Sequence, residues 1–269
     1  MNCKWQRRSE RASELACSHP FASQGLRFYE RLARFQKSLY AQIEADCGKG
    51  KERRVSGTLR SEFDVFVLLP RFAAFLSVLE EIAPPPLARS ARELHSLDAG
   101  RWQQILRRFW EECPVAVNLE PAEELVSWLF LQPYAEYLAD HSEWGPRVGA
   151  PCTCPLCGSK PQVGVLRPEG DGGKRSLICS LCAVEWDYAR IGCAACGEEN
   201  PQKLALCIAE EFRYVRLEAC ESCHRYIKTV DLTKNGHAVP VVDELAMIPL
   251  DLWAADHGYQ KIHPNLLGI

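Results

Sequence analysis

The stretch CPLCGSKPQVGVLRPEGDGGKRSLICSLC, residues 154–182, carries a C-x2-C pair at each end and a segment rich in alternating apolar residues between them. A second stretch with the same order, CAACGEENPQKLALCIAEEFRYVRLEACESC, follows at residues 193–223. The first pairs of the two stretches are 39 residues apart and the second pairs 41, which indicates duplication of one small module. Within a stretch, 21 or 23 residues separate the pairs, enough for an antiparallel hairpin that returns one pair to the other.

These cysteine pairs predict two metal sites. Each C-x2-C turn directs two sulfurs at one centre, and the glycine that follows it at Gly158 and Gly197 relieves the backbone. Two turns complete a tetrahedron of thiolates, as in zinc ribbons and rubredoxins, and such sites suit zinc and iron alike. The predicted ligands are Cys154, Cys157, Cys179 and Cys182 for one site, and Cys193, Cys196, Cys220 and Cys223 for the other. An interleaved arrangement joining the first pair with the third is the alternative; the repeat favours sequential sites because each copy then has a complete one.

Closed sites of this kind limit the function. Four sulfurs leave no open coordination position, so the metals are expected to act as scaffolds, or as electron carriers if iron is bound. We therefore expect that the protein is not an enzyme. The chain has a formal charge of −3, and all of that excess lies after residue 150. Two divalent ions held by eight thiolates would move this half to about −7, which argues against nucleic acid as a partner.

The first half of the sequence predicts a helical bundle. An apolar stripe with helical spacing runs from a Ser23 cap to Gly48, and a second helix is expected from Pro70 until the three prolines at 84–86. Asp98 can cap a third helix that runs through Trp110. A fourth should open at Pro121 and be kinked or divided at Pro133.

A few further residues have two readings. Cys152 is close enough in sequence to compete for the first metal, although a spare thiol is the favoured interpretation. Cys207 lies in an apolar run and is expected in the core, and His224 could replace a cysteine only if one of four sulfurs were missing. The glycines at residues 170–173 lack the Lys-Ser/Thr of a phosphate loop and predict a hairpin tip.

Together these patterns define an α+β protein, with a helical bundle followed by two tandem rubredoxin-like or zinc-ribbon modules. We expect a helical domain over residues 1–148, ribbons over 149–190 and 191–236, and a tail over 237–269 that packs on the body. The first 15 residues are charged throughout and lack the apolar stretch of a signal peptide, and no apolar run is long enough to span a bilayer. A cytoplasmic protein with reduced thiols and no membrane insertion is therefore expected.

Several motifs outside the cysteines give the sequence a more specific character. They are Cys-Pro-Leu-Cys-Gly-Ser at 154–159, Glu185-Trp186, Tyr226-x-Lys228, His19-Pro20-Phe21, Asp243-Glu244-Leu245 and Gly258-Tyr259. With these motifs in this order, the chain resembles the formate dehydrogenase accessory protein FdhE family over most of its length. Pro249 departs from the pattern by interrupting what would be the C-terminal helix of that family.

The resemblance implies a cytoplasmic accessory metalloprotein required for active formate dehydrogenase. Such a protein would bind the catalytic subunit before assembly and export, and would hold two ions, iron or zinc, on the eight paired cysteines. The alternative is a rubredoxin-like electron carrier or a thiol redox protein, since C-x2-C pairs serve both kinds of chemistry.

Overall fold

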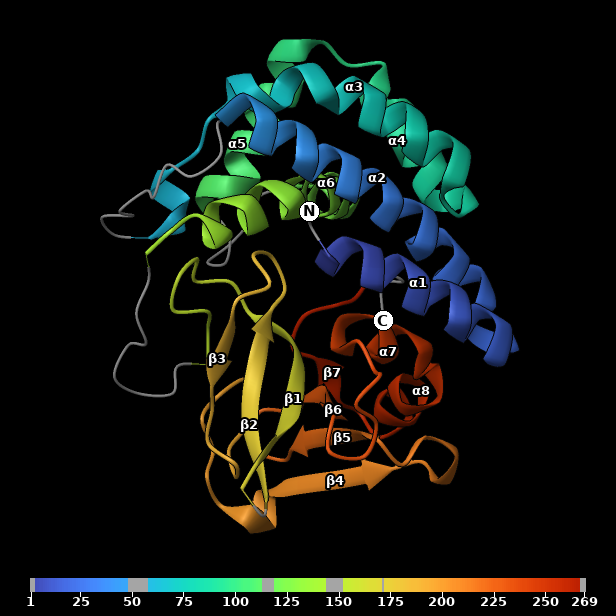
Figure 1. Cartoon of the computed structure of the whole chain (residues 1–269), viewed down its shortest axis with the longest axis vertical. Coiled ribbons are helices and arrows are strands. Elements are labelled where there is room, and N and C mark those ends of the chain that lie inside the picture. The colour runs from blue at the N-terminus through green and yellow to red at the C-terminus, as the bar shows by residue number, and fades with distance from the viewer. Residues whose placement is uncertain (1–2, 48–57, 113–118, 144–151, 171, 267–269) are drawn as a thin grey trace. The chain divides into compact units, whose positions relative to one another are not determined.

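The computed structural model describes residues 3–47, 58–112, 119–143, 152–170 and 172–266 (Figure 1). The chain divides into two compact units. The first contains Met1–Ser9, Phe28–Gly145 and Leu156–Gly158, and the second contains Glu10–Arg27, Pro146–Pro155 and Ser159–Ile269. The first unit is helical and the second contains the sheet, so the predicted α+β class is confirmed.

The helices before the sheet are α1 (Cys3–Ser18), α2 (Ser23–Cys47), α3 (Val65–Ile82), α4 (Pro85–His95), α5 (Ala99–Glu112) and α6 (Pro121–Asp140). Helix α3 packs against α4 and α5, and α6 packs against the same two helices. Phe130 of α6 lies against Phe72 and Phe75 of α3, with ring centroids 4.9 and 5.2 Å apart. Burial of such aromatic side chains is the main contribution to the stability of a bundle.

Some helix limits agree with the sequence and others do not. Helix α2 begins at the predicted place, although Ser23 has helical dihedrals and is its first residue rather than its cap. The Asp98 carboxylate caps α5 by accepting from Arg101 N at 2.9 Å. The expected cap at Gly48 lies outside the described residues. The start predicted at Pro70 is wrong, because α3 begins at Val65, where the Asp64 carboxylate accepts from Phe66 N at 3.0 Å.

Further features of the helices differ from the prediction. Pro70 lies inside α3. Helix α6 begins at Pro121 as predicted, but it is not divided at Pro133. Each proline removes one backbone hydrogen bond, and burial of the apolar face offsets that loss. The proline run stops α3, but Pro85 also opens α4 as its first residue, a position where no N–H is needed. Helix α1 was missed because charged residues surround its buried Trp5, Ala12 and Leu15.

The second unit is built on one sheet. Its strands are β1 (Pro161–Glu169), β2 (Gly172–Cys179), β3 (Glu185–Asp187), β4 (Leu204–Ile208), β5 (Val215–Cys220), β6 (Arg225–Asp231) and β7 (Gln260–Lys261). Their order is β3-β2-β1-β6-β5-β4, with β7 also paired to β6. Strands β1 and β2 form the expected hairpin around residues 170–173. In Figure 1 these two strands stand upright, whereas β4 and β5 lie across the view.

The two cysteine modules share this sheet rather than standing as separate ribbons. Strand β1 of the first pairs in parallel with β6 of the second, with Gly164 opposite Thr229. A Cβ atom at position 164 would lie 2.3 Å from the Thr229 hydroxyl oxygen, so only glycine permits this close pairing.

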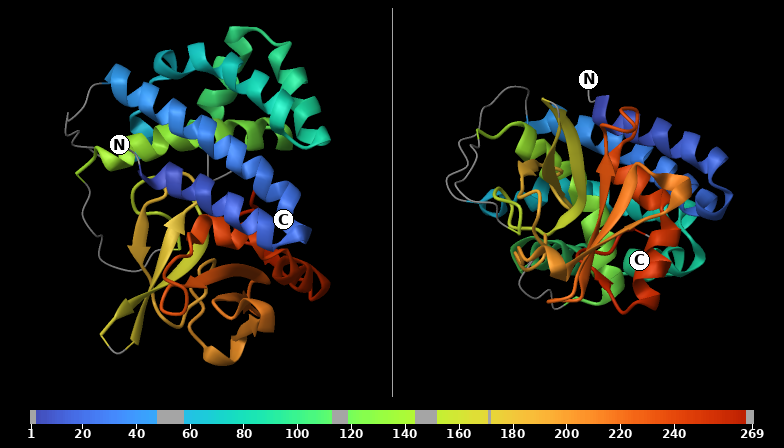
Figure 2. Two further views of the ribbon diagram at one scale, coloured as in Figure 1. Left: turned by 45° about the vertical axis from the view of Figure 1, so that its right-hand side comes forward. Right: turned by 90° about the horizontal axis from the view of Figure 1, so that it is seen from below.

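Two short helices cover one face of the sheet: α7 (Pro240–Ala246) and α8 (Ile248–Asp256). Helix α7 packs on β1 and β6, and Figure 2 shows both red helices beside the orange strands. Pro249 lies in the first turn of α8, so the tail forms two helices instead of one. Within the described ranges, no helix is long and apolar enough to cross a membrane.

Candidate metal centres

Each of the four C-x2-C pairs forms the same kind of turn. In three of them the N–H of the first cysteine donates to a carbonyl five residues later: Cys154 to Ser159 at 2.8 Å, Cys179 to Val184 at 2.9 Å and Cys193 to Glu198 at 2.8 Å. The turn therefore closes on itself, and both sulfurs point to the same side of the chain. The duplication seen in the sequence thus extends to individual backbone hydrogen bonds.

The residue after the second cysteine of every pair has a left-handed backbone. Gly158 and Gly197 have φ values of 77° and 78°, and Ala183 and His224 have values of 53° and 52°. Ala183 and His224 are the two residues other than glycine with positive φ in the part of the chain that the structure describes. The sequence indicated this left-handed conformation only at the two glycines. The shared C-x2-C spacing was the signal that could have predicted it at Ala183 and His224 as well.

The sulfurs come together in two groups of four. One group is Cys154, Cys157, Cys179 and Cys182, and the other is Cys193, Cys196, Cys220 and Cys223. Within each group all sulfurs lie within 4.8 Å of one another. The structure thus brings the pairs together sequentially, and no interleaved group forms among the residues described. The hairpin β1–β2 returns the second pair of the first module, and β4–β5 does the same in the second module.

The spacing of the sulfurs fits a four-coordinate ion. Metal–sulfur bonds of about 2.3 Å in a tetrahedron place the sulfurs about 3.8 Å apart. The observed separations are 3.6 Å between Cys154 and Cys182, 3.7 Å between Cys193 and Cys223, and 3.8 Å between Cys196 and Cys220. Both groups can therefore hold a zinc or iron ion with little movement of the chain.

Backbone amides support these thiolates, and the two groups differ in exposure. Leu181 N lies 3.4 Å from the Cys179 sulfur, and Ala195 N lies 3.3 Å from that of Cys193, so each amide can donate to sulfur. All four cysteines of the first group are buried, whereas Cys196 is exposed and Cys223 half-buried. Burial raises the pKa of Cys193 to about 11, so an incoming ion must displace its proton.

The remaining candidate ligands lie outside both groups. Cys152 belongs to neither group, in agreement with its favoured interpretation as a spare thiol, and its sulfur lies 3.2 Å from the Tyr188 hydroxyl and 3.8 Å from the Cys193 carbonyl, beside the second group and not the first. Its place in the sequence does not show which group it lies beside, because both modules share one sheet and the second group is close to the first strands. Cys207 is half-buried rather than in the core, because its strand β4 has a neighbour on one side only. His224 turns its ring toward Tyr259.

Two saturated four-sulfur groups on one sheet, joined to a helical unit, define the class of protein: a tandem tetracysteine protein whose metals would shape the fold rather than activate water. Known protein families match both of these modules. The family model described as "FdhE, central domain" matches residues 153–190, and "FdhE, C-terminal domain" matches residues 191–267.

Relatives extend this similarity to the helical unit. The chain is 30% identical to "Protein FdhE homolog" of Aquifex aeolicus over 93% of this chain and 90% of that protein. It is 32% identical to the Pseudomonas aeruginosa homologue over 97% of this chain and 88% of that protein. The crystal structure of the FdhE protein from Pseudomonas aeruginosa superposes with a TM-score of 0.72 at 26% identity, covering 98% of this chain and 95% of that one.

The chain belongs to the FdhE family, whose members are known as formate dehydrogenase accessory proteins. The resemblance drawn from the sequence motifs is thereby confirmed.

Proposed function

We propose that this protein is a maturation factor that holds two metal ions and binds the catalytic subunit of formate dehydrogenase in the cytoplasm, before assembly and export. In this proposal the eight paired cysteines are the ligands and the ions are iron or zinc. The ions fix the cysteine turns and thereby the surface that meets the partner. The protein itself performs no chemical step.

The observation that carries this proposal is the pair of closed four-sulfur groups in a member of the FdhE family. A saturated tetrahedral site has no position for substrate or water, so it suits a scaffold better than a catalyst. The name of the family connects it to formate dehydrogenase, and binding is the kind of activity that a metal-pinned sheet without a catalytic position can provide.

Metal analysis of the full chain, purified without oxygen, tests the ligand assignment. The wild type should contain about two equivalents of metal, and Cys154→Ser should lose about one of them because three thiolates hold an ion far more weakly. Cys207→Ser is the matched control, since Cys207 lies outside both groups. Equal metal content in the two variants would refute the assignment.

Co-purification tests the partner. Metal-loaded protein should capture the catalytic subunit of formate dehydrogenase, and a strain lacking the protein should lose formate oxidation. Failure of both results would refute the proposed function. A tagged, metal-loaded zinc ribbon of unrelated sequence serves as the control for nonspecific capture.

The second candidate function, electron transfer, draws support from the exposure of Cys196 in the second group. A metal centre near the surface is accessible to a redox partner, and iron bound by four thiolates can carry one electron. This candidate requires a visible thiolate-to-iron absorption band that bleaches reversibly when the protein is reduced. Colourless zinc protein that supports formate oxidation would rule it out.

A further inference from the structure

A cavity of about 280 Å³ opens on the face of the sheet that α7 and α8 do not cover. Side chains alternate between the two faces of a sheet, so the register decides which residues share a face. Leu206 is opposite Glu218, which is opposite Ile227, and all three line the cavity. On the other face, Lys228 donates to the Glu244 carbonyl at the end of α7.

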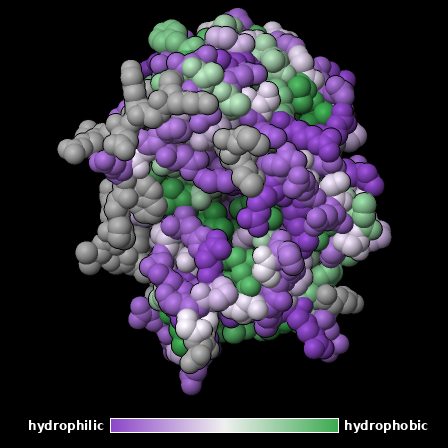
Figure 3. Space-filling view, in the orientation of Figure 1, coloured by the Kyte–Doolittle hydropathy of each residue, from purple (hydrophilic) through white to green (hydrophobic). Residues whose placement is uncertain are grey.

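The rim of this cavity is apolar and exposed. Leu206 is 61% exposed and Ile191 is 54% exposed, and both line the cavity. Ile208, two residues along the same strand, is 48% exposed. Figure 3 shows one face of the molecule as mostly hydrophilic, with apolar residues between the polar ones over the strands in its lower part. Large apolar side chains that gather around a cavity indicate a binding surface more than isolated ones do.

Strand β4, which supplies Leu206, is at the edge of the sheet. Its sequence, LALCI, contains none of the lysines, prolines or inward charges with which proteins block an edge strand from pairing. An unblocked edge next to an apolar cavity is suited to an extended segment of another chain, whose alternate side chains enter the cavity.

The cavity also has a positive lining. Among the lining residues are four arginines, Arg175, Arg190, Arg216 and Arg225, and one carboxylate, Glu218. Arg175 and Arg216 both pair with Glu218, the latter at 2.7 Å. The lining charge is therefore +3, and it remains +1 if a divalent ion on four thiolates adds −2 at the neighbouring group. This local excess contrasts with the net charge of −3 for the chain and favours a segment with a carboxylate.

The size of the cavity restricts what can fill it. Pockets for small molecules have volumes of roughly 300–1,000 Å³, so this one lies just below that range. It accommodates an apolar side chain or two more readily than a whole cofactor. The supporting wall is rigid, since the Arg175 guanidinium also donates to the carbonyls of Ala189 at 2.7 Å and Gly192 at 3.1 Å.

We propose that this groove binds an extended, acidic and apolar peptide segment of the client protein, laid along β4, with one apolar side chain in the cavity and a neighbouring carboxylate on its arginines. The inference rests on the proposed function for the identity of the client and names the surface that recognises it. Cys193 and Cys220 line the cavity and belong to the second four-sulfur group. A metal ion at that group would fix the two cysteine turns that line the groove.

Fluorescence anisotropy with labelled 12-residue peptides, tiled along the formate dehydrogenase catalytic subunit, tests the groove on the full metal-loaded chain. We expect binding by peptides that place Asp or Glu beside a large apolar residue. Leu206→Glu should weaken that binding at least tenfold. Leu252→Glu is the matched control, since Leu252 is 58% exposed on α8, and it should change binding less than twofold. Replacing the acidic residue of the peptide with its amide should also weaken binding, most strongly at low salt.

The outcomes separate the groove from the proposed function. Equal binding by the two variants overturns the groove, as does the absence of peptide binding by a protein that still captures the whole subunit; the proposed function then stands. Peptide binding that depends on Leu206, without capture of the subunit, keeps the groove and overturns the proposed function. If the wild type binds no peptide and forms a dimer that Leu206→Glu splits, the occupant is a second copy and the proposal is wrong.

Discussion

The left-handed backbone at the end of each cysteine turn should cost free energy when the residue there has a side chain. Gly197 has a φ of 78°, and a Cβ atom there would meet the Cys152 sulfur at 3.8 Å, an ordinary contact. Gly197→Ala should therefore lower the free energy of unfolding by about 1–2 kcal/mol through the backbone alone. Denaturant unfolding of the metal-loaded protein measures this change.

Gly236→Ala is the control, because its nearest atom is 3.9 Å away and its φ lies outside the left-handed region. If Gly197→Ala and Gly236→Ala lowered the free energy of unfolding equally, the left-handed conformation at Gly197 would not be the cause of the loss. The converse changes, Ala183→Gly and His224→Gly, remove strain but add freedom to the unfolded chain, so their net effect should be small.

The pairing of β1 with β6 joins the two modules and depends on Gly164. Gly164→Ala should destabilise the protein by about 1–3 kcal/mol, because Thr229 is fully buried and branched and cannot move aside. The double variant Gly164→Ala/Thr229→Ala should recover most of this loss, since it removes the hydroxyl and methyl groups that the new Cβ would meet. Thermal or denaturant unfolding of the single and double variants measures the coupling.

Gly173→Ala is the control, because a Cβ atom there would lie 3.7 Å from its nearest neighbours. This substitution should leave the free energy of unfolding almost unchanged in the same assay. A double variant no more stable than Gly164→Ala alone would contradict the parallel pairing.

Elements set by local pattern could be predicted from the sequence. The stripe of α2, the cap of α5, the hairpin tip and the grouping of the cysteines each depend on residues near one another in the chain or on a repeat. The pairing of β1 with β6 joins residues more than 60 positions apart and has no local signal. The alternating pattern of its strand predicts an exposed side chain for Lys228. The side chain is fully buried instead, because Glu244 and Asp251 of the C-terminal tail pair with it.

A buried ionic cluster fastens α7 and α8 to the strands. Lys228 Nζ lies 3.0 Å from Glu244 and 2.5 Å from Asp251, and Lys261 Nζ lies 2.9 Å from Glu244. The Tyr226 hydroxyl donates to Asp251 at 2.8 Å. The residues Tyr226, Lys228 and Glu244, which the sequence offered only as family motifs, thus act together in the fold.

Glu244→Gln should cost about 3–5 kcal/mol, because it leaves the two buried ammonium groups of Lys228 and Lys261 with Asp251 as their one carboxylate in the cluster. Burial raises the pKa of Glu244, but Lys228 and Lys261 outweigh it and lower the pKa to about 2. The ionised Glu244 therefore contributes its full stabilisation to the folded protein when the pH is above 4.5, its ordinary pKa. This stabilisation is lost as the pH falls toward about 2.

Unfolding free energies measured between pH 7 and pH 2 test this prediction. Glu244→Gln should lack that part of the acid dependence. Glu185→Gln, which breaks the partly exposed pair with Arg167, is the control and should cost at most about 1 kcal/mol. A flat difference between wild type and Glu244→Gln across the whole pH range would contradict the assignment.

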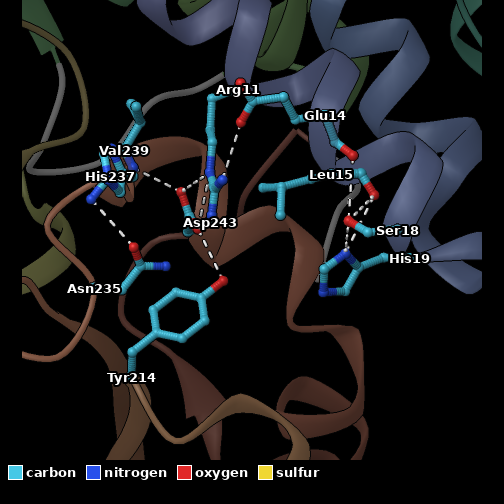
Figure 4. Close-up of polar contacts among 10 residues, drawn as sticks. All are labelled: Arg11, Glu14, Leu15, Ser18, His19, Tyr214, Asn235, His237, Val239 and Asp243. Carbon is cyan, nitrogen blue, oxygen red and sulfur yellow. Dashed lines mark hydrogen bonds and ion pairs between the residues drawn. The ribbon is translucent and has the colours of Figure 1, made fainter.

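A segment near the start of the chain belongs to the unit that contains its end. Residues Glu10–Arg27 are part of the second unit, although at least 134 positions separate them from the first strand of its sheet. The contact that holds them is a forked ion pair between Arg11 and Asp243 of α7 (Figure 4). The two guanidinium nitrogens Nε and Nη2 lie 3.0 and 2.6 Å from the carboxylate oxygens.

Asp243 is fully buried, so this carboxylate depends on its partners. Tyr214 Oη donates to it at 2.9 Å and Val239 N at 2.7 Å, and Figure 4 shows these groups around the Arg11 fork. Burial raises the pKa of Tyr214, which keeps its hydroxyl protonated as a donor. Beyond this cluster, His19 stacks on Phe212 with ring centroids 5.2 Å apart.

Arg11→Met should therefore loosen the second unit although it changes no residue of the sheet. Loss of the charged hydrogen bonds should cost at least about 1.5–3 kcal/mol, because the Asp243 charge stays buried with two donors instead of a full set. Hydrogen exchange should rise in α7 and at Val239, while metal content stays at the wild-type value. Arg27→Met is the control, since Arg27 is exposed in the same segment and its hydrogen bond is with the nearby Ser23. Unchanged exchange in Arg11→Met would mean that the ion pair between Arg11 and Asp243 contributes nothing to the stability of the second unit.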